Sequence, residues 1–129
     1  MPFYGARIRN VVAGDDFGVE RTVSDLVAGT SCTKAWMTVK TVATDADVNA
    51  KFQKVITTTN VNGVGQIEDN GATTTEVSLR FDCTRSDTIL LTPGVAYFYD
   101  IQILLSTGEI YTPETGTFTT IQGVTIAVT

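Results

Sequence analysis

The chain has 129 residues, of which 43% are hydrophobic and 18% charged, and its formal net charge is −5. This length and composition predict one globular domain, residues 1–129, whose core is large enough to fold without disulfides or metals. The nine Lys and Arg residues form no cluster. That excludes the cationic face that nucleic acids and anionic membranes require, so neither is an expected partner.

Threonine and valine are abundant, and their branched Cβ atoms favour strands over helices. The segment RTVSDLVAGTSCT, residues 21–33, predicts a strand followed by a loop centred on Gly29. The next segment, TKAWMTVK, alternates with a period of two residues and predicts a second strand. One face of this strand carries Ala35, Met37 and Val39, and the other face carries Lys34, Trp36, Thr38 and Lys40.

The segment TDADVNAKFQKVI departs from this alternation. Val48, Phe52 and Val55 follow each other at helical spacing, and Thr44 stands where a helix-capping residue is expected. Aspartates near the start would also stabilise the first turn of a helix. The pattern predicts one short helix at residues 44–55.

Alternation returns in the second half of the chain, where it predicts two further strands. The first, TEVSLRFD, places three large apolar residues on one face: Val77, Leu79 and Phe81. The second, AYFYDIQILL, has an apolar stripe of Tyr97, Tyr99, Ile101, Ile103 and Leu105, and an opposite stripe of Phe98, Asp100, Gln102 and Leu104. We expect Asp100 on a half-hydrated outer face, or else semi-buried with hydrogen bonds from a loop.

Turn residues separate the predicted strands, at EDNG (68–71) and at STGE (106–109), where Gly108 closes a hairpin. A last strand is expected at residues 124–128. Together these elements predict a mainly β fold, a single antiparallel β-sandwich with one helical crossover.

The two cysteines, Cys32 and Cys83, do not fit the bridge of antibody domains. In those domains a tryptophan lies well beyond the first cysteine and a tyrosine lies two residues before the second. Here Trp36 follows Cys32 by only four residues, and position 81 is Phe81. We therefore expect two reduced thiols.

No pattern of residues predicts catalysis, a cofactor or a metal. The chain has no histidine, which removes the commonest base and metal ligand. The segment DADVNAKFQKVI begins like a calcium loop, but it has Ala50 in place of the glycine and Ile56 in place of the bidentate glutamate. Carboxylates that a fold can bring together for glycoside chemistry are expected to be solvated: Asp15, Asp16, Glu68, Asp69 and Asp87. We expect no enzyme.

The order of landmarks from about Gly14 to Thr125 resembles a known class of proteins. These landmarks are GDDFGVERTV, LVAGTSCTKAWMTVK, DADVNAKFQKVITT, GVGQIEDNG, LRFDCTRSDTILLTPGVAYFYDIQILLSTGEIYTPETGTFT and a final GVT. They resemble small Ig-like β-sandwich proteins of tailed bacteriophages and are similar to the N-terminal domain of phage baseplate upper proteins. YDIQ followed by STGEIYTPETG is the most specific part.

The resemblance implies a non-enzymatic virion component that binds other virion proteins. The expected roles are a capsid decoration or cement protein, bound to the major capsid protein, or a tail or baseplate accessory. The resemblance also implies several copies in the particle, hence a homo-oligomer, and synthesis in the host cytoplasm. The sequence agrees with cytoplasmic synthesis, since it has no bilayer-spanning apolar run and no secretion signal at its start. A glycan-binding, adhesin-like module is the alternative.

Trp36, with Lys34 and Lys40, is the candidate protein interface, because tryptophan is enriched where protein contacts are strongest. Two interpretations of this stripe stay open. It lies inside, with lysine stems that reach out to water, or it lies on the outer face and anchors a partner.

Overall fold

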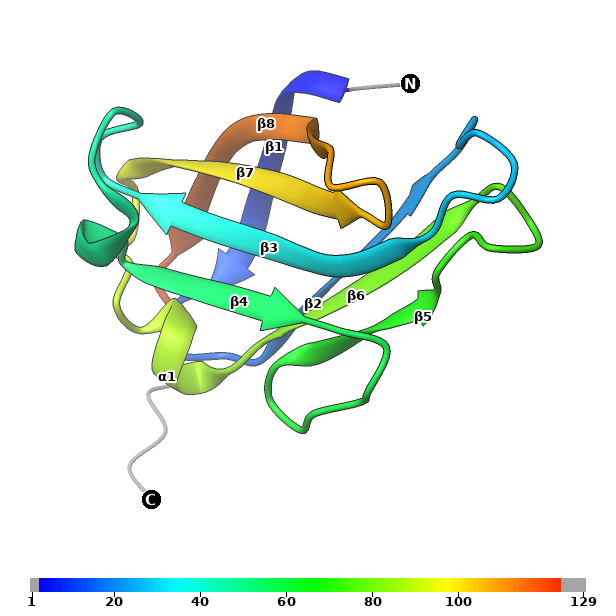
Figure 1. The fold of residues 1–129 in the computed structure, drawn as a ribbon. Helices are drawn as coiled ribbons and strands as arrows, with labels where there is room; N and C mark the ends of the chain where they lie inside the picture. The colour runs from blue at the N-terminus through cyan, green and yellow to red at the C-terminus, as the bar shows by residue number, and fades with distance from the viewer. Residues whose placement is uncertain (1–2, 124–129) are drawn as a thin grey trace.

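The structure, a computed structural model, describes the backbone of residues 3–123 and the side chains of residues 6–123. Eight strands form two sheets packed face to face (Figure 1). The strands are β1 (Phe3–Val12), β2 (Phe17–Val23), β3 (Cys32–Lys40), β4 (Phe52–Ile56), β5 (Gly65–Asp69), β6 (Val77–Cys83), β7 (Ala96–Leu105) and β8 (Ile110–Ile121). The mainly β sandwich predicted from sequence is therefore confirmed. The strand expected at residues 124–128 lies outside the described residues.

The strand order is that of an immunoglobulin-like sandwich. One sheet has the order β1-β8-β7-β3-β4 and the other β2-β6-β5. In immunoglobulin terms, β8-β7-β3-β4 correspond to strands G-F-C-C′, and β2-β6-β5 correspond to B-E-D. The pairings are antiparallel except that β1 pairs in parallel with β8. The expectation of a purely antiparallel sandwich is thus corrected at β1.

A tyrosine near the start of β7 adds a second feature of this fold. The backbone N–H of Thr92 donates a hydrogen bond of 2.8 Å to the phenolic oxygen of Tyr97. Such a contact, from the start of strand F back to the chain upstream, is the tyrosine corner of immunoglobulin-like domains. It fixes the turn that leads from β6 into β7.

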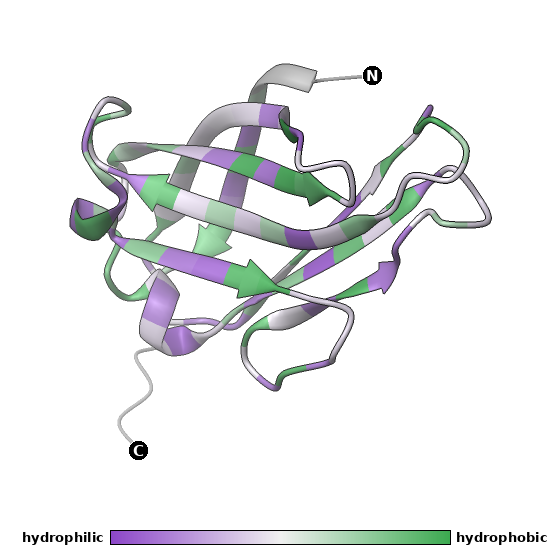
Figure 2. Cartoon of the chain, in the orientation of Figure 1, coloured by the Kyte–Doolittle hydropathy of each residue, from purple (hydrophilic) through white to green (hydrophobic). Residues whose placement is uncertain are grey.

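The alternation of side chains builds the core between the sheets. Ala35, Met37 and Val39 on β3 are fully buried, and the predicted inward stripes of β6 and β7 are buried as well. The alternating hydropathy of β7 is visible in Figure 2. Phe118 of β8 lies at the centre, where its ring makes edge contacts with the rings of Phe17, Phe52 and Tyr99 at centroid distances of 6.1–6.4 Å.

The helix predicted at residues 44–55 is wrong. The structure has only a 3-10 turn, η1 (Asp47–Asn49), and residues from Phe52 onward form the strand β4. Val48 is 89% exposed while Phe52 is buried, so the helical spacing of these residues does not correspond to one buried face. Phe52 and Ile56 are four residues apart. This spacing places two side chains on the same face of a helix, but it also places them on the same face of a strand.

Lys54 lies between those two residues and points inward as well. Its ammonium Nζ lies 2.5 Å from a carboxylate oxygen of Asp87 and donates a hydrogen bond of 2.8 Å to the carbonyl of Gly63. These partners compensate the buried charge, which lets β4 pair with β3. Asp87 belongs to a short helix that was not predicted, α1 (Arg85–Thr88), and its carboxylate also accepts a hydrogen bond of 2.8 Å from the N–H of Thr84.

A polar contact connects the sheets where antibody domains have their disulfide between strands B and F. The Arg21 guanidinium of β2 donates from Nε to Oε1 of Glu114 at 2.7 Å, and the Tyr99 hydroxyl of β7 donates to Oε2 of the same residue. Glu114 is only 6% exposed. Burial, together with the Glu114 carboxylate, raises the pKa of Tyr99 above its usual value.

Cys32 and Cys83 lie elsewhere, both buried and unpaired, which confirms the free thiols.

Candidate functional site

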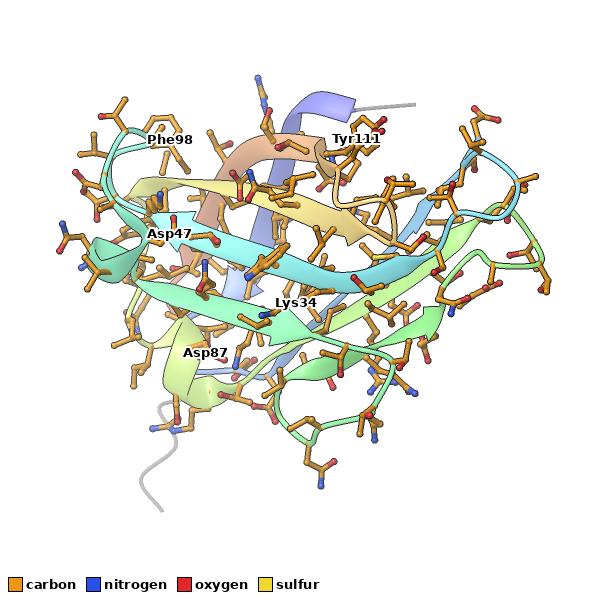
Figure 3. All side chains as sticks on the ribbon, viewed as in Figure 1. Lys34, Asp47, Asp87, Phe98 and Tyr111 are labelled. Atoms are coloured by element: carbon orange, nitrogen blue, oxygen red, sulfur yellow. The ribbon has the colours of Figure 1, made fainter. Side chains whose placement is uncertain are left out.

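The outer face of the five-stranded sheet carries the residues predicted to contact a partner. Because Ala35, Met37 and Val39 point into the core, the other stripe of β3 points outward. This decides between the two interpretations of Trp36, which lies on the outer face and is partly exposed. Lys34 projects from the same face, between β3 and β4 in Figure 3.

Trp36 lies in a row of side chains that crosses the sheet. Its neighbours in register are Val55 on β4 and Gln102 on β7. The Lys34 ammonium lies 5.4 Å from the centre of the Trp36 ring, within the range of a cation–π contact. Val55 is 36% exposed and Gln102 donates to the hydroxyl of Thr112 at 3.2 Å. The result is a partly exposed indole on the outer face of the sheet, with the Lys34 ammonium over its ring and the edge strand β4 beside it.

Lys40, the third predicted contact residue, is engaged within the chain. Its Nζ donates to the carbonyl of Asp45 at 2.6 Å and lies 2.8 Å from a carboxylate oxygen of Asp47. The Lys40 ammonium lowers the pKa of Asp47. Lys40 therefore fastens the loop between β3 and η1, while Trp36 and Lys34 remain accessible.

A shallow hollow of about 410 Å³ lies on the same face beside Lys40. Phe98 of β7, 45% exposed, forms one wall, and Asp100, Thr115 and Thr117 form others. Burial raises the pKa of Asp100, which is half-buried on this outer face as the alternation predicted. Figure 3 shows Phe98 at the end of β7 nearest the η1 loop. An exposed aromatic ring beside hydroxyls and a carboxylate can stack on a sugar ring and hydrogen-bond to it.

Sequence reasoning missed part of this face. Phe98 and Gln102 belonged to a stripe already visible in AYFYDIQILL, so the alternation itself carried the signal. Val55 was assigned to a helix, and no local pattern placed it beside Trp36. Only the pairing of β4 with β3 does that.

Four of the five carboxylates considered for glycoside chemistry have separate structural roles, and the fifth, Asp15, is exposed. Asp16 accepts a hydrogen bond of 2.7 Å from the N–H of Arg85, and Asp87 pairs with Lys54. Glu68 pairs with Arg80 at 3.1 Å, and Asp69 accepts from the N–H of Gly71 at 2.9 Å. Within residues 3–123, no group of three or more Cys, Asp or Glu side chains is arranged to hold a metal ion.

Across the same described part of the chain, no helix is long and apolar enough to cross a lipid bilayer. A comparison with models of known protein families gives no match, and a comparison with curated proteins gives none either.

Proposed function

We propose that this chain is a non-enzymatic structural protein of a tailed-phage virion, which binds other virion proteins through the outer face of its five-stranded sheet. The observation that carries the proposal is Trp36, a partly exposed indole on that face, between Val55 on the edge strand β4 and Gln102 on β7. A large aromatic side chain in such a place supplies contact area at little entropic cost. The order of sequence landmarks, which resembles small Ig-like phage proteins, supplies the virion context.

The expected partners are the major capsid protein, for a decoration or cement protein, or tail and baseplate proteins, for an accessory. In either case many copies assemble on the particle. A rigid sandwich with a preformed aromatic anchor suits this role, because binding then orders few side chains.

The test is binding of the purified protein to particles that lack it, followed by electron microscopy to locate the added density. Trp36→Ala should weaken binding more than about 30-fold, the equivalent of about 2 kcal/mol. Ile89→Ala is the matched control, since Ile89 is 55% exposed but lies on the segment after α1, away from this face. Wild-type protein that binds no particle would refute the virion role, and full binding by Trp36→Ala would refute the docking face.

The hollow beside Phe98 favours a second function, binding of a glycan. Titration of labelled protein with a panel of oligosaccharides, followed by NMR, tests it. Phe98→Ala should abolish sugar-induced shifts around Asp100 and Thr117, while Trp36→Ala should leave them. A panel that causes no shifts at millimolar concentration would reject the sugar site.

A further inference from the structure

A second surface, at one end of the sandwich, has the form of a binding groove. It lies between the loop that follows β2 (residues 24–30) and the β7–β8 hairpin, and its volume is about 540 Å³. We call it the hairpin groove. Its apolar lining includes Leu26, Val27, Ile103, Leu105, Tyr111 and Pro113. It is separate from the row around Trp36, because Ile103 and Leu105 are inward-facing residues of β7.

The hairpin groove exposes apolar side chains at its rim and reaches the core at its floor. Val27 is 76% exposed and Tyr111 is 51% exposed, whereas Ile103 is 1% and Leu105 7% exposed. Figure 3 places Tyr111 at the hairpin end of the sheet, at the opposite end of β7 from Phe98. A concave apolar surface of this size is in the range of sites that bind a ligand or a partner side chain.

The charges at the groove are negative. Asp25 contributes a carboxylate from the loop and Glu109 contributes one from the hairpin, and no Lys or Arg lines the groove. None of the ion pairs found among residues 3–123 includes either carboxylate. The hydroxyl of Tyr111 donates to Glu109 at 2.5 Å, which ties that carboxylate to the rim. An occupant that brings a positive charge would therefore meet two acidic groups that no cation of the described chain neutralises.

Both walls of the groove are preformed by backbone contacts. The N–H of Leu26 donates to the carbonyl of Thr75 at 3.0 Å, and the N–H of Ser106 donates to the carbonyl of Ser31 at 2.7 Å. Asp25 has a φ of 65°, in the left-handed region that non-glycine residues seldom occupy. Such a conformation persists where the surrounding structure holds it, so little ordering of the loop is needed on binding.

We propose that the hairpin groove binds a segment of a partner protein in which a large apolar side chain is flanked by lysine or arginine. The apolar side chain fills the floor, and the flanking cations face Asp25 on one wall and Glu109 on the other. A peptide segment fits better than a single small amine, because the two carboxylates come from different elements, the loop after β2 and the β7–β8 hairpin, that line the same apolar groove. This inference does not depend on the virion role or on the Trp36 face.

The probe is the blocked tetrapeptide acetyl-Lys-Leu-Phe-Lys-amide, titrated into the ¹⁵N-labelled full chain and followed by NMR. We expect shifts of the amides of Leu26, Val27, Glu109 and Tyr111, and weaker binding as sodium chloride is raised. Peptides with Glu in place of Lys, or Ser in place of Leu and Phe, should cause no shifts there. Shifts spread evenly over the protein, or equal for all three peptides, would overturn the proposal.

Variants locate the binding and separate it from folding. Asp25→Asn with Glu109→Gln should weaken binding about tenfold, the effect of losing two solvent-exposed charge contacts. The control pair, Asp15→Asn with Glu20→Gln, removes the same charge from exposed positions that do not line the groove and should bind like wild type. Unchanged affinity in the groove variant would overturn the proposal. So would groove shifts with phenethylamine but none with the peptide, since the ligand would then be a small amine.

Discussion

Replacing Glu114 with glutamine perturbs the buried contact between the sheets without changing its shape. In the native protein the Glu114 carboxylate accepts from Arg21 Nε at 2.7 Å and from the Tyr99 hydroxyl. Hydrogen bonds to a charged group contribute about 1.5–3 kcal/mol, and neutral ones about 0.5–1.5 kcal/mol. Glutamine can turn its single oxygen to Arg21 Nε and its NH2 group to the Tyr99 hydroxyl, which then accepts instead of donating, so both contacts lose the carboxylate charge and each should lose about 1 kcal/mol. The loss at Arg21 is no larger than that at Tyr99, because the Arg21 side chain is 37% exposed and water screens its charge.

The expected cost of Glu114→Gln is therefore about 2 kcal/mol of unfolding free energy, or a fall in Tm of about 8 °C for a chain of this size. Urea unfolding followed by the fluorescence of Trp36 measures it. The matched control is Glu109→Gln, which removes a carboxylate that accepts from an exposed tyrosine, and it should cost less than about 0.5 kcal/mol. A cost for Glu114→Gln no greater than that of this control would show that the buried carboxylate does not stabilise the contact between the sheets.

Other predictions concern glycines and thiols. Gly116→Ala should lower the unfolding free energy measured in urea by about 1–3 kcal/mol, because the new Cβ would lie 2.1 Å from a backbone oxygen of β1. The control is Gly18→Ala, whose Cβ would meet no atom within 4 Å and which should be neutral. Cys32 and Cys83 should resist maleimide in the folded protein and both react in urea without reductant; a single reactive thiol, or none, would contradict free cysteines. Burial raises the pKa of Cys83 from 9.0 to about 12, so its thiol stays protonated to a higher pH in the folded state than in the unfolded chain. Unfolding free energy should therefore fall as the pH rises from 9 to about 12, and Cys83→Ala should flatten that slope.

The parts of the fold that the sequence predicted are those that a local period determines. Val77, Leu79 and Phe81 alternate with polar residues, so their burial follows from one stretch of chain. The segment that begins at Phe52 does not determine its own secondary structure, because a spacing of four residues between apolar side chains fits one face of a helix and one face of a strand equally. The choice depends on Asp87, more than thirty positions away, which compensates the inward-pointing Lys54.

In the candidate site too, a local pattern predicts some features, and other features depend on residues that are distant in sequence. The outward position of Trp36 was one of two interpretations of a local stripe, and the burial of Met37 on the opposite face decides it. The partners of Trp36 across the sheet depend on strand pairing, which no local pattern contains. The engagement of Lys40 likewise depends on how the following loop folds back to place Asp45 and Asp47 beside it.

The parallel pairing of β1 with β8 determines how the domain carries a load. Phe3 lies opposite Glu114, and Val12 lies opposite Ile121, so β1 enters at one end of the ladder and β8 leaves at the other (Figure 1). Tension applied through these two strands acts along them and tries to slide one past the other. The hydrogen bonds between them then share the force together, whereas a hairpin pulled from its open end breaks them one after another. When force is applied through β1 and β8, we therefore expect the parallel ladder between them to be loaded in shear and to resist stretching.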